Sequence, residues 1–249
     1  MRNIAIVVPV YNEGDSLIDS VHVVCDTINK MDSRIRIYYV NDGSTDSTLE
    51  VLNRVKESRN LSNLKILSYP LNKGYGAALK FGARTAQDEG FWGVVFIDSD
   101  LTNPLNEIPN LIRNLEDSIL VKASRYVSGA QVIDVPIKRK IFSVLGNRSL
   151  KLLLNSPIRD ITNGFRAWRV QDFLALNVQK SGFDSIIEEF VLAMQAGYQI
   201  SEVPSILKVR NKIQRKSSAS YTIVAILGYI KPAIQYFRFR VKNKLKRKV

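Results

Sequence analysis

Asp98 and Asp100 are the residues whose types and spacing are best suited to chemistry. They flank a single serine and directly follow the apolar run 94–97. Two carboxylates this close repel each other unless a cation lies between them. A hard cation such as Mg²⁺ or Mn²⁺ that also holds phosphate oxygens of a ligand would supply that charge. The alternative is an acidic turn or helix cap after a strand, because Asp-x-Asp is a short motif.

The apolar run before this pair is short, rich in β-formers and uninterrupted, which predicts a strand buried on both faces of a parallel sheet. Similar runs, separated by amphipathic segments, recur along the chain. They predict strands at 4–10, 35–40, 64–67, 94–97, 119–123, 200–204 and 206–209, and helices at 15–28, 45–55, 77–87, 104–115, 141–154 and 183–196. The alternation fits right-handed βαβ units, so we expect an α/β protein whose first 125 residues form a mostly parallel, Rossmann-like sheet flanked by helices.

Three of these strands end in polar turns, at residues 11–13, 41–44 and 98–100. Carboxyl ends of parallel strands share one edge of the sheet, where open α/β folds bind their ligands. A dinucleotide-binding site is disfavoured, because Gly74-Tyr75-Gly76 has Leu79 in the place of the third glycine. The turns therefore predict one polar crevice around the Asp98–Asp100 pair.

The composition indicates one large domain with an extension, 1–217 and 218–249. The single cysteine excludes an intramolecular disulfide and a cysteine-based zinc site, and no histidine-based nucleophilic triad is present. The net charge is +13, and all acidic residues lie before residue 203. Since residues 1–202 are neutral overall, the excess charge belongs to the C-terminal segment, which suggests an anionic surface as its partner.

That segment carries a helical apolar stripe with Lys231, Arg238 and Lys242 on its flank. The stripe comprises Ile223, Leu227, Ile230, Ile234, Phe237 and Val241. Its apolar run 219–230 is shorter than the about 20 residues that a membrane span needs. We expect a helix lying on anionic headgroups and a peripheral membrane protein at the cytoplasmic face. The alternative is an ordinary amphipathic helix packed on the domain or on a partner.

The polar turns, in their order, resemble those of the inverting family 2 glycosyltransferases of GT-A fold. Within that family, the polyprenyl-phosphate hexose transferases of the dolichyl-phosphate mannose synthase type are the most similar. The resemblance covers residues 3–221. It implies that the opening motif 8–13 contacts the nucleotide through Pro9, Tyr11 and Glu13, and that Asp42 of the 41–44 turn contacts the base. Residues 72–78 resemble the glycine-rich donor loop, with Lys73 and Gly74.

Further along, the segment 98–104 resembles the family's metal motif, with Asp98 and Asp100 as ligands of Mg²⁺ or Mn²⁺. Close relatives often carry Gln where this chain has Thr102. The later matches are the 124–126 turn with Arg125, the acceptor-side segment with Asp160 and 163–166, the late Glu188, the 202–204 motif, and Arg215 and Ser220 of a basic motif whose Gly and Lys are absent here.

Sugar transfer leaves negative charge on the departing diphosphate, which a metal at Asp98 and Asp100 would stabilise. Arg125, Arg139 or Arg215 would add charge-assisted hydrogen bonds to phosphate. The acceptor decides whether a base is needed. A sugar hydroxyl needs a carboxylate, with Asp160 and Glu188 as candidates, whereas a lipid phosphate is already an anion. The predicted catalytic residues are therefore Asp100, Arg125, Asp160 and Glu188.

The sequence thus predicts metal-dependent, inverting transfer of a hexose from UDP- or GDP-hexose to a polyprenyl (dolichyl or undecaprenyl) phosphate at a membrane surface. One alternative is the same fold acting on a saccharide or protein hydroxyl. Another is a non-catalytic polyanion-binding protein whose tail grips nucleic acid. Against that, the basic residues alternate with an apolar stripe and no aromatic stacking platform is visible, so no nucleic-acid partner is expected.

Overall fold

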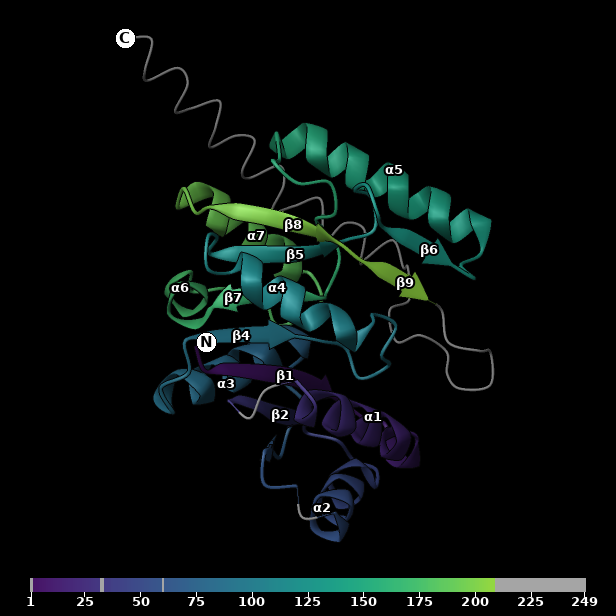
Figure 1. The fold of residues 1–249 in the computed structure, drawn as a ribbon, viewed down its shortest axis with the longest axis vertical. Helices are drawn as coiled ribbons and strands as arrows, with labels where there is room; N and C mark the ends of the chain where they lie inside the picture. The colour runs from purple at the N-terminus through teal and green to yellow at the C-terminus, as the bar shows by residue number, and fades with distance from the viewer. Residues whose placement is uncertain (1, 32–33, 60, 209–249) are drawn as a thin grey trace.

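A computed structural model describes residues 2–31, 34–59 and 61–208 of the chain (Figure 1). The extension predicted at 218–249, Arg215 and Ser220 lie outside these residues, so the predicted domain boundary stays a prediction. The strands are β1 (Ile4–Val10), β2 (Ile35–Asp42), β3 (Leu64–Tyr69), β4 (Gly93–Phe96), β5 (Leu120–Ser124), β6 (Gln131–Ile133), β7 (Arg166–Arg169), β8 (Ile200–Pro204) and β9 (Ile206–Lys208). The α-helices are α1 (Leu17–Asn29), α2 (Thr48–Ser58), α3 (Tyr75–Asp88), α4 (Ile108–Asn114), α5 (Ile137–Leu154), α6 (Val170–Ala175) and α7 (Ser185–Gln195), with 3₁₀ turns η1 (Gly14–Ser16) and η2 (Leu105–Glu107).

Seven strands form one sheet in the order β3-β2-β1-β4-β7-β5-β8. All neighbours pair in parallel except those of β7, which runs antiparallel between β4 and β5. In Figure 1 the arrows of β1, β4 and β5 point to the same side of the molecule. The expected α/β architecture with a mostly parallel sheet is confirmed.

Strand β7 was not anticipated by the sequence pattern. Its residues Arg166-Ala167-Trp168-Arg169 begin and end in arginine, so no apolar run marks them. We expected the first 125 residues to form the sheet by themselves. Instead, β7 from the later part of the chain lies between β4 and β5. Later residues thus enter the middle of the sheet, and the segment leading into β7 lies beside the end of β4.

Alternate residues of β1 enter two different cores, which explains why this strand is apolar throughout. Ile4, Ile6 and Val8 belong to a core that includes residues of α1, α2 and α4. Ala5 and Val7 belong to a second core with residues of α3, α6 and α7. In Figure 1, α1 and α4 lie in front of the sheet and α3 lies behind it. The single cysteine, Cys25, is buried in the first core.

Helix α5 begins at Ile137, four residues before the predicted start, because Pro136 provides an extended residue directly ahead of it. It lies at the outer side of the molecule beyond β8, next to the small sheet in which β6 pairs with β9 (Figure 1). Within residues 2–31, 34–59 and 61–208, no helix has the length and apolar character required to cross a membrane.

Candidate active site

The turns after β1 and β2 are joined by hydrogen bonds through short polar side chains. The Asn12 amide donates to Ser44 Oγ at 2.9 Å, and the Thr45 amide donates to Asn12 Oδ1 at 2.8 Å. Thr48 Oγ1 accepts from the amides of Glu13 and Gly14, at 2.8 and 2.9 Å. The expected convergence of these two turns is therefore present, with Pro9 half-buried and Tyr11 45% exposed beside them.

Asp42 organises the donor loop that precedes α3. Its carboxylate accepts from Tyr69 Oη at 2.7 Å, from Asn72 Nδ2 at 3.1 Å, and from the amides of Lys73 and Gly74 at 2.8 and 2.9 Å. The adjacent Gly43 has a φ of +63°, and a Cβ there would lie 2.3 Å from the carbonyl carbon of Leu71. Asp42 thus holds the loop in place, and its contact with a nucleotide base stays a prediction.

The donor loop also rests on the segment that precedes α7. Gly74 has a φ of +98°, and a Cβ there would lie 2.5 Å from the Ser181 carbonyl oxygen. The Gly76 amide donates to that same oxygen at 2.6 Å. The Lys73 ammonium lies 4.9 Å from the centre of the Tyr69 ring. A Cβ at Gly76 would likewise lie 2.6 Å from Ser185 Oγ, so the contact between the donor loop and this segment requires glycine at both positions.

Glu188 supports this contact from behind. Its Oε2 accepts from the amides of Gln179 and Lys180, at 3.0 and 2.6 Å. The carboxylate therefore orders the segment that leads to Ser181, on which the donor loop rests. This arrangement gives Glu188 a structural task that its sequence motif did not indicate.

Asp98 and Asp100 follow β4 at the same edge of the sheet. Ser99 Oγ donates to Glu13 Oε1 at 3.2 Å, which ties this turn to the end of β1. Asp98 is half-buried and Asp100 is exposed. Burial and the neighbouring Asp100 charge raise the pKa of Asp98 to about 6. Asp100 Oδ1 accepts from the Thr102 amide at 3.1 Å, in a turn where Leu101 has a positive φ of 53°.

This pair fits a hard divalent cation by the chemistry of its donors. Both ligands are carboxylates, and the Asp100 charge adds to the effect of burial in raising the pKa of Asp98, a repulsion that a cation would relieve. No group of three or more His, Cys, Asp or Glu side chains suited to a metal occurs in the described ranges. A cation held here would complete its shell with ligand phosphate oxygens and water, as Mg²⁺ commonly does.

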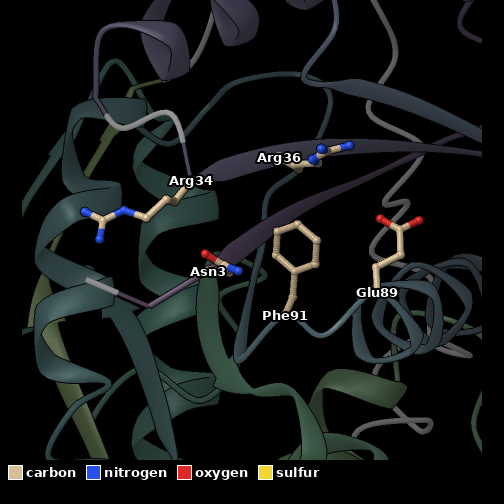
Figure 2. Close-up of a pocket in the computed structure, with 5 residues that line it drawn as sticks. All are labelled: Asn3, Arg34, Arg36, Glu89 and Phe91. Carbon is tan, nitrogen blue, oxygen red and sulfur yellow. The ribbon is translucent and has the colours of Figure 1, made fainter.

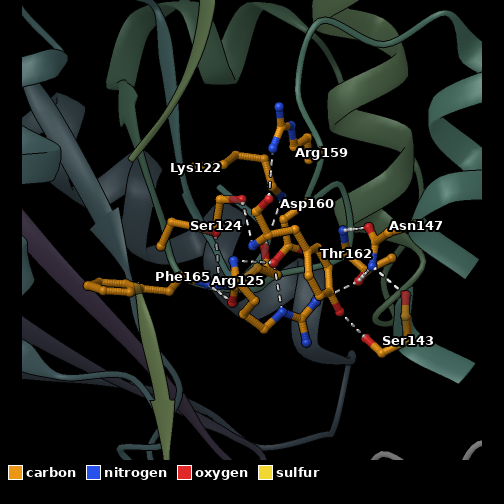
Figure 3. A network of polar contacts seen from close by, with 12 residues as sticks. Lys122, Ser124, Arg125, Ser143, Asn147, Arg159, Asp160, Thr162 and Phe165 are labelled. Atoms are coloured by element: carbon orange, nitrogen blue, oxygen red, sulfur yellow. Dashed lines mark hydrogen bonds and ion pairs between the residues drawn. The ribbon is translucent and has the colours of Figure 1, made fainter. Parts of the chain in front are cut away.

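Arg125, at the end of β5, forms a two-pronged ion pair with Asp160. Arg125 Nε and Nη2 lie 2.7 Å from Asp160 Oδ2 and Oδ1, and the Arg125 amide donates to Oδ2 at 2.9 Å (Figure 3). Nη2 also donates to Thr162 Oγ1 at 3.0 Å. Asp160 is fully buried, while the Arg125 side chain is 13% exposed. Asp160 therefore fixes the guanidinium at the carboxyl edge of the sheet.

The same network anchors α5. Asn147 Nδ2 donates to Thr162 Oγ1 at 2.9 Å, and Asn147 Oδ1 accepts from the Ile161 amide at 2.8 Å. Ser143 Oγ lies 2.7 Å from the hydroxyl of Tyr126, the residue after Arg125. The helix is thus bonded through its polar inner face to the segments that hold Arg125. Arg139 lies on the exposed first turn of this helix, and its phosphate-binding role stays a prediction.

Beside this network lie three buried charged residues whose burial the sequence pattern did not indicate. Lys122, Arg166 and Glu189 are 0%, 0% and 1% exposed. Arg166 forms an ion pair with Glu189, and Lys122 Nζ donates to the Asn163 carbonyl oxygen at 2.9 Å. Burial, followed by the charge of Arg166, lowers the pKa of Lys122 to about 7. Arg166 lay in the 163–166 motif and Glu189 adjoins Glu188, but the local pattern does not say which of these side chains is buried.

A separate hollow lies away from this edge of the sheet. It has a volume of about 290 Å³ and is lined by Asn3, Arg34, Arg36, Glu89 and Phe91 (Figure 2). These residues lie at the amino ends of β1, β2 and β4, opposite the polar turns. The hollow is therefore separate from the candidate active site.

A mostly parallel sheet with an Asp-x-Asp pair and a glycine-rich loop at its carboxyl edge defines the GT-A class of glycosyltransferases. Residues 5–175 match the family described as "Glycosyl transferase family 2", and the chain belongs to this family. The family and enzyme class suggested by the sequence motifs are thus confirmed.

Two related mannosyltransferases align with nearly the whole chain. The chain is 25% identical over 226 residues to the undecaprenyl-phosphate mannosyltransferase of Micrococcus luteus, covering 89% of this chain and 90% of the relative. It is 28% identical over 222 residues to the polyprenol monophosphomannose synthase of Mycolicibacterium smegmatis, covering 86% and 81%. Its fold resembles the glucosyl-3-phosphoglycerate synthase of Mycobacterium tuberculosis, crystallised with Mn²⁺, UDP and phosphoglyceric acid, with a TM-score of 0.62, 19% identity, and 95% and 78% coverage.

Proposed function

We propose that this protein transfers a hexose, with inversion, from a UDP- or GDP-hexose to a polyprenyl phosphate at the cytoplasmic face of a membrane. Two named relatives support the acceptor class, since their names place undecaprenyl phosphate or a polyprenol monophosphate in the reaction. The proposal also rests on this chain's own residues, which suit a phosphate acceptor better than a hydroxyl.

The observation that carries the proposal is that the carboxylates of both candidate bases already accept hydrogen bonds from other groups of the protein. Asp160 is fully buried and accepts three hydrogen bonds from Arg125. Glu188 accepts hydrogen bonds from two backbone amides of the segment beneath the donor loop. A general base must reach the proton that it removes. A phosphate acceptor is already ionised and needs no such base, so it matches a site in which these carboxylates position other groups.

On the donor side, we assign Asp98 and Asp100 to hold Mg²⁺ or Mn²⁺. The bound cation would neutralise charge on the departing diphosphate. The chain itself supplies the frame for the donor: Asp42 holds the loop with Lys73 and Gly74, and Glu13 joins the β1 turn to the Asp98–Asp100 turn. These contacts keep the donor loop and the acidic turn in fixed relation, which is the condition for a productive donor geometry.

On the acceptor side, we assign Arg125 to the lipid phosphate. Its guanidinium is charged at all relevant pH values and is oriented by Asp160 before any ligand arrives. This preorganisation lowers the cost of binding an anion.

Helix α5 supports a membrane setting for this acceptor. Its outer face is apolar although it is exposed, with exposed fractions of 67% for Ile137, 49% for Ile141, 71% for Phe142, 54% for Leu145 and 85% for Leu152. Five cations lie on the helix, and no acidic residue occurs between 135 and 159; the cations are Lys138, Arg139, Lys140, Arg148 and Lys151. An exposed apolar stripe with flanking cations matches an anionic lipid surface. Because α5 is bonded to the Arg125 network, docking it on the membrane would bring headgroup phosphates to the acceptor side.

The test is a panel of UDP- and GDP-hexoses incubated with the full chain, Mn²⁺ and a polyprenyl phosphate, scored for a lipid-linked sugar. We expect product with one donor class, and none when dephosphorylated polyprenol replaces the phosphate. Transfer to a free saccharide or to a peptide hydroxyl, with none to the lipid phosphate, would assign the protein to the alternative acceptor class.

A further inference from the structure

Tyr75, a donor-loop residue to which the sequence motifs assign no role, contacts the candidate metal-binding carboxylate directly. It is the first residue of α3, and its hydroxyl donates to Asp98 Oδ1 at 3.1 Å. Its ring stacks on Phe183, with ring centres 4.4 Å apart and an interplanar angle of 24°. A phenol has an ordinary pKa of about 10, so the Tyr75 hydroxyl carries the proton that it donates at neutral pH.

A buried ion pair stands behind this hydroxyl. Arg166 is fully buried, and its Nη2 lies 2.8 Å from Glu189 Oε2. The same guanidinium donates through Nη1 to the Gly164 carbonyl oxygen at 2.6 Å and lies 4.8 Å from the centre of the Phe96 ring. Its charge also interacts with Tyr75. These contacts hold Arg166 in one place next to the phenol.

The backbone of Gly164 closes the other side of this arrangement. A Cβ at this position would lie 3.0 Å from Asp98 Oδ2 and 3.2 Å from the Tyr75 hydroxyl. Asp98 Oδ1 therefore accepts a hydrogen bond from the phenol, while Oδ2 lies against the backbone of Gly164. That backbone is itself held by Arg166 through the Gly164 carbonyl and by Lys122 through the Asn163 carbonyl.

We propose that Tyr75 is a positioning residue for Asp98. The buried Arg166–Glu189 pair holds the Tyr75 hydroxyl where it can donate to Asp98. This inference rests on the proposed metal role of Asp98. A carboxylate that is oriented before the cation arrives loses less freedom on binding it. Partners of this kind are typically worth about 10-fold to 100-fold in metal affinity. Tyr75 also belongs to the first turn of α3, so it links the donor loop to the acidic turn.

The test uses Tyr75→Phe in the full chain, which keeps the ring on Phe183 and removes only the hydroxyl. Mn²⁺ is titrated into the protein in the presence of GDP or UDP, and the dissociation constant is read from the electron paramagnetic resonance signal of free Mn²⁺. Tyr38→Phe is the matched control, because it removes a buried tyrosine hydroxyl that donates to Glu89 at the opposite edge of the sheet. Asp98→Asn serves as the reference for a lost ligand.

We expect Tyr75→Phe to weaken Mn²⁺ binding by roughly 10-fold to 100-fold, with a melting temperature close to that of Tyr38→Phe. Gly164→Ala, which places a methyl group against Asp98 from the other side, is expected to weaken Mn²⁺ binding as well. Wild-type Mn²⁺ affinity in Tyr75→Phe, with Asp98→Asn impaired, would overturn this inference alone. A wild-type chain that binds no Mn²⁺ would overturn the metal role of Asp98 together with it.

Discussion

The guanidinium of Arg125 and the carboxylate of Asp160 face each other through two parallel contacts of 2.7 Å, across 35 positions of the chain. The carboxylate is fully buried and the arginine reaches the surface with 13% of its side chain exposed. A buried carboxylate with this partner works as an orienting group, and the arginine is the member of the pair that a ligand can reach.

Asp160→Asn is the substitution that separates an orienting role from a base role. We expect kcat/KM for polyprenyl phosphate to fall about 10-fold to 100-fold, because a charge-assisted hydrogen bond is worth roughly 1.5–3 kcal/mol. The KM for the donor is expected to stay unchanged, since the Asp160 carboxylate is hydrogen-bonded to Arg125 on the acceptor side. Steady-state kinetics with each substrate varied in turn would measure both effects.

The shape of the pH–rate profile gives the control for this experiment. If Asp160 only orients Arg125, the acid limb of kcat/KM keeps its position in Asp160→Asn. Disappearance of that limb in a folded variant would instead make Asp160 the base and favour a hydroxyl acceptor. Arg125→Lys keeps the charge but not the two-pronged geometry, and it should lose activity to a similar extent.

Asp98→Ala and Asp100→Ala are expected to lower transfer by at least roughly 10²-fold to 10³-fold, the range seen when one group that stabilises developing charge is removed. Both side chains lie in a turn at the sheet edge, so the melting temperature should change little. Chelation of divalent cations should reduce the wild type to the level of these variants. Full activity in both variants with the metal chelated would contradict a metal-dependent mechanism.

The exposed face of α5 predicts a defined defect in lipid binding. Phe142→Glu combined with Leu145→Glu places two negative charges on the apolar stripe, where both side chains are more than half exposed. Sedimentation with liposomes that contain anionic lipid should show weaker binding, because like charges meet and apolar burial is lost. Folding should be unaffected, since neither side chain enters a core.

Val23→Glu is a matched control for that experiment. Val23 is 45% exposed on α1, so it adds a negative charge at an apolar surface position outside α5. It should leave liposome binding close to that of the wild type. Equal binding by the α5 variant and the wild type would remove α5 from the membrane contact and leave that role to residues 218–249.

Lys122 predicts a pH dependence of stability. Its pKa is lowered from 10.5 to about 7 by burial and by Arg166, while Glu189 and Asp160 act in the opposite direction and Arg125 adds to the lowering. Between pH 7 and 10.5 the unfolded chain binds this proton and the folded chain does not. Stability must therefore rise with pH across this window, by at most about 1.4 kcal/mol per pH unit from this group.

Lys122→Met isolates that contribution, because the remaining titrating groups are common to both proteins. Chemical denaturation at pH 7 and pH 9 should show a larger gain in unfolding free energy for the wild type than for the variant. Parallel changes in the two proteins would mean that the buried lysine titrates as it does in the unfolded chain.

Local sequence pattern was sufficient for the parallel part of this fold. The apolar runs at 4–10, 35–40 and 94–97 predicted β1, β2 and β4, because strands buried on both faces need apolar side chains at nearly every position. The helical spacing of Leu17, Val21, Val24 and Ile28 predicted α1 in the same way. The polar turns after three strands predicted the edge at which Asp98 and Asp100 lie.

Tertiary structure decided which charged side chains are buried and which of them are paired. No local pattern shows that Arg166 is buried, yet it lies within the sheet because Glu189, 23 residues later, forms an ion pair with it there. Asp160 reads as a candidate base, yet Arg125 occupies its carboxylate. The physical reason is that periodicity reports only whether a position suits an apolar core. The partner that makes a buried charge tolerable comes from another element, and only the assembled fold brings the two together.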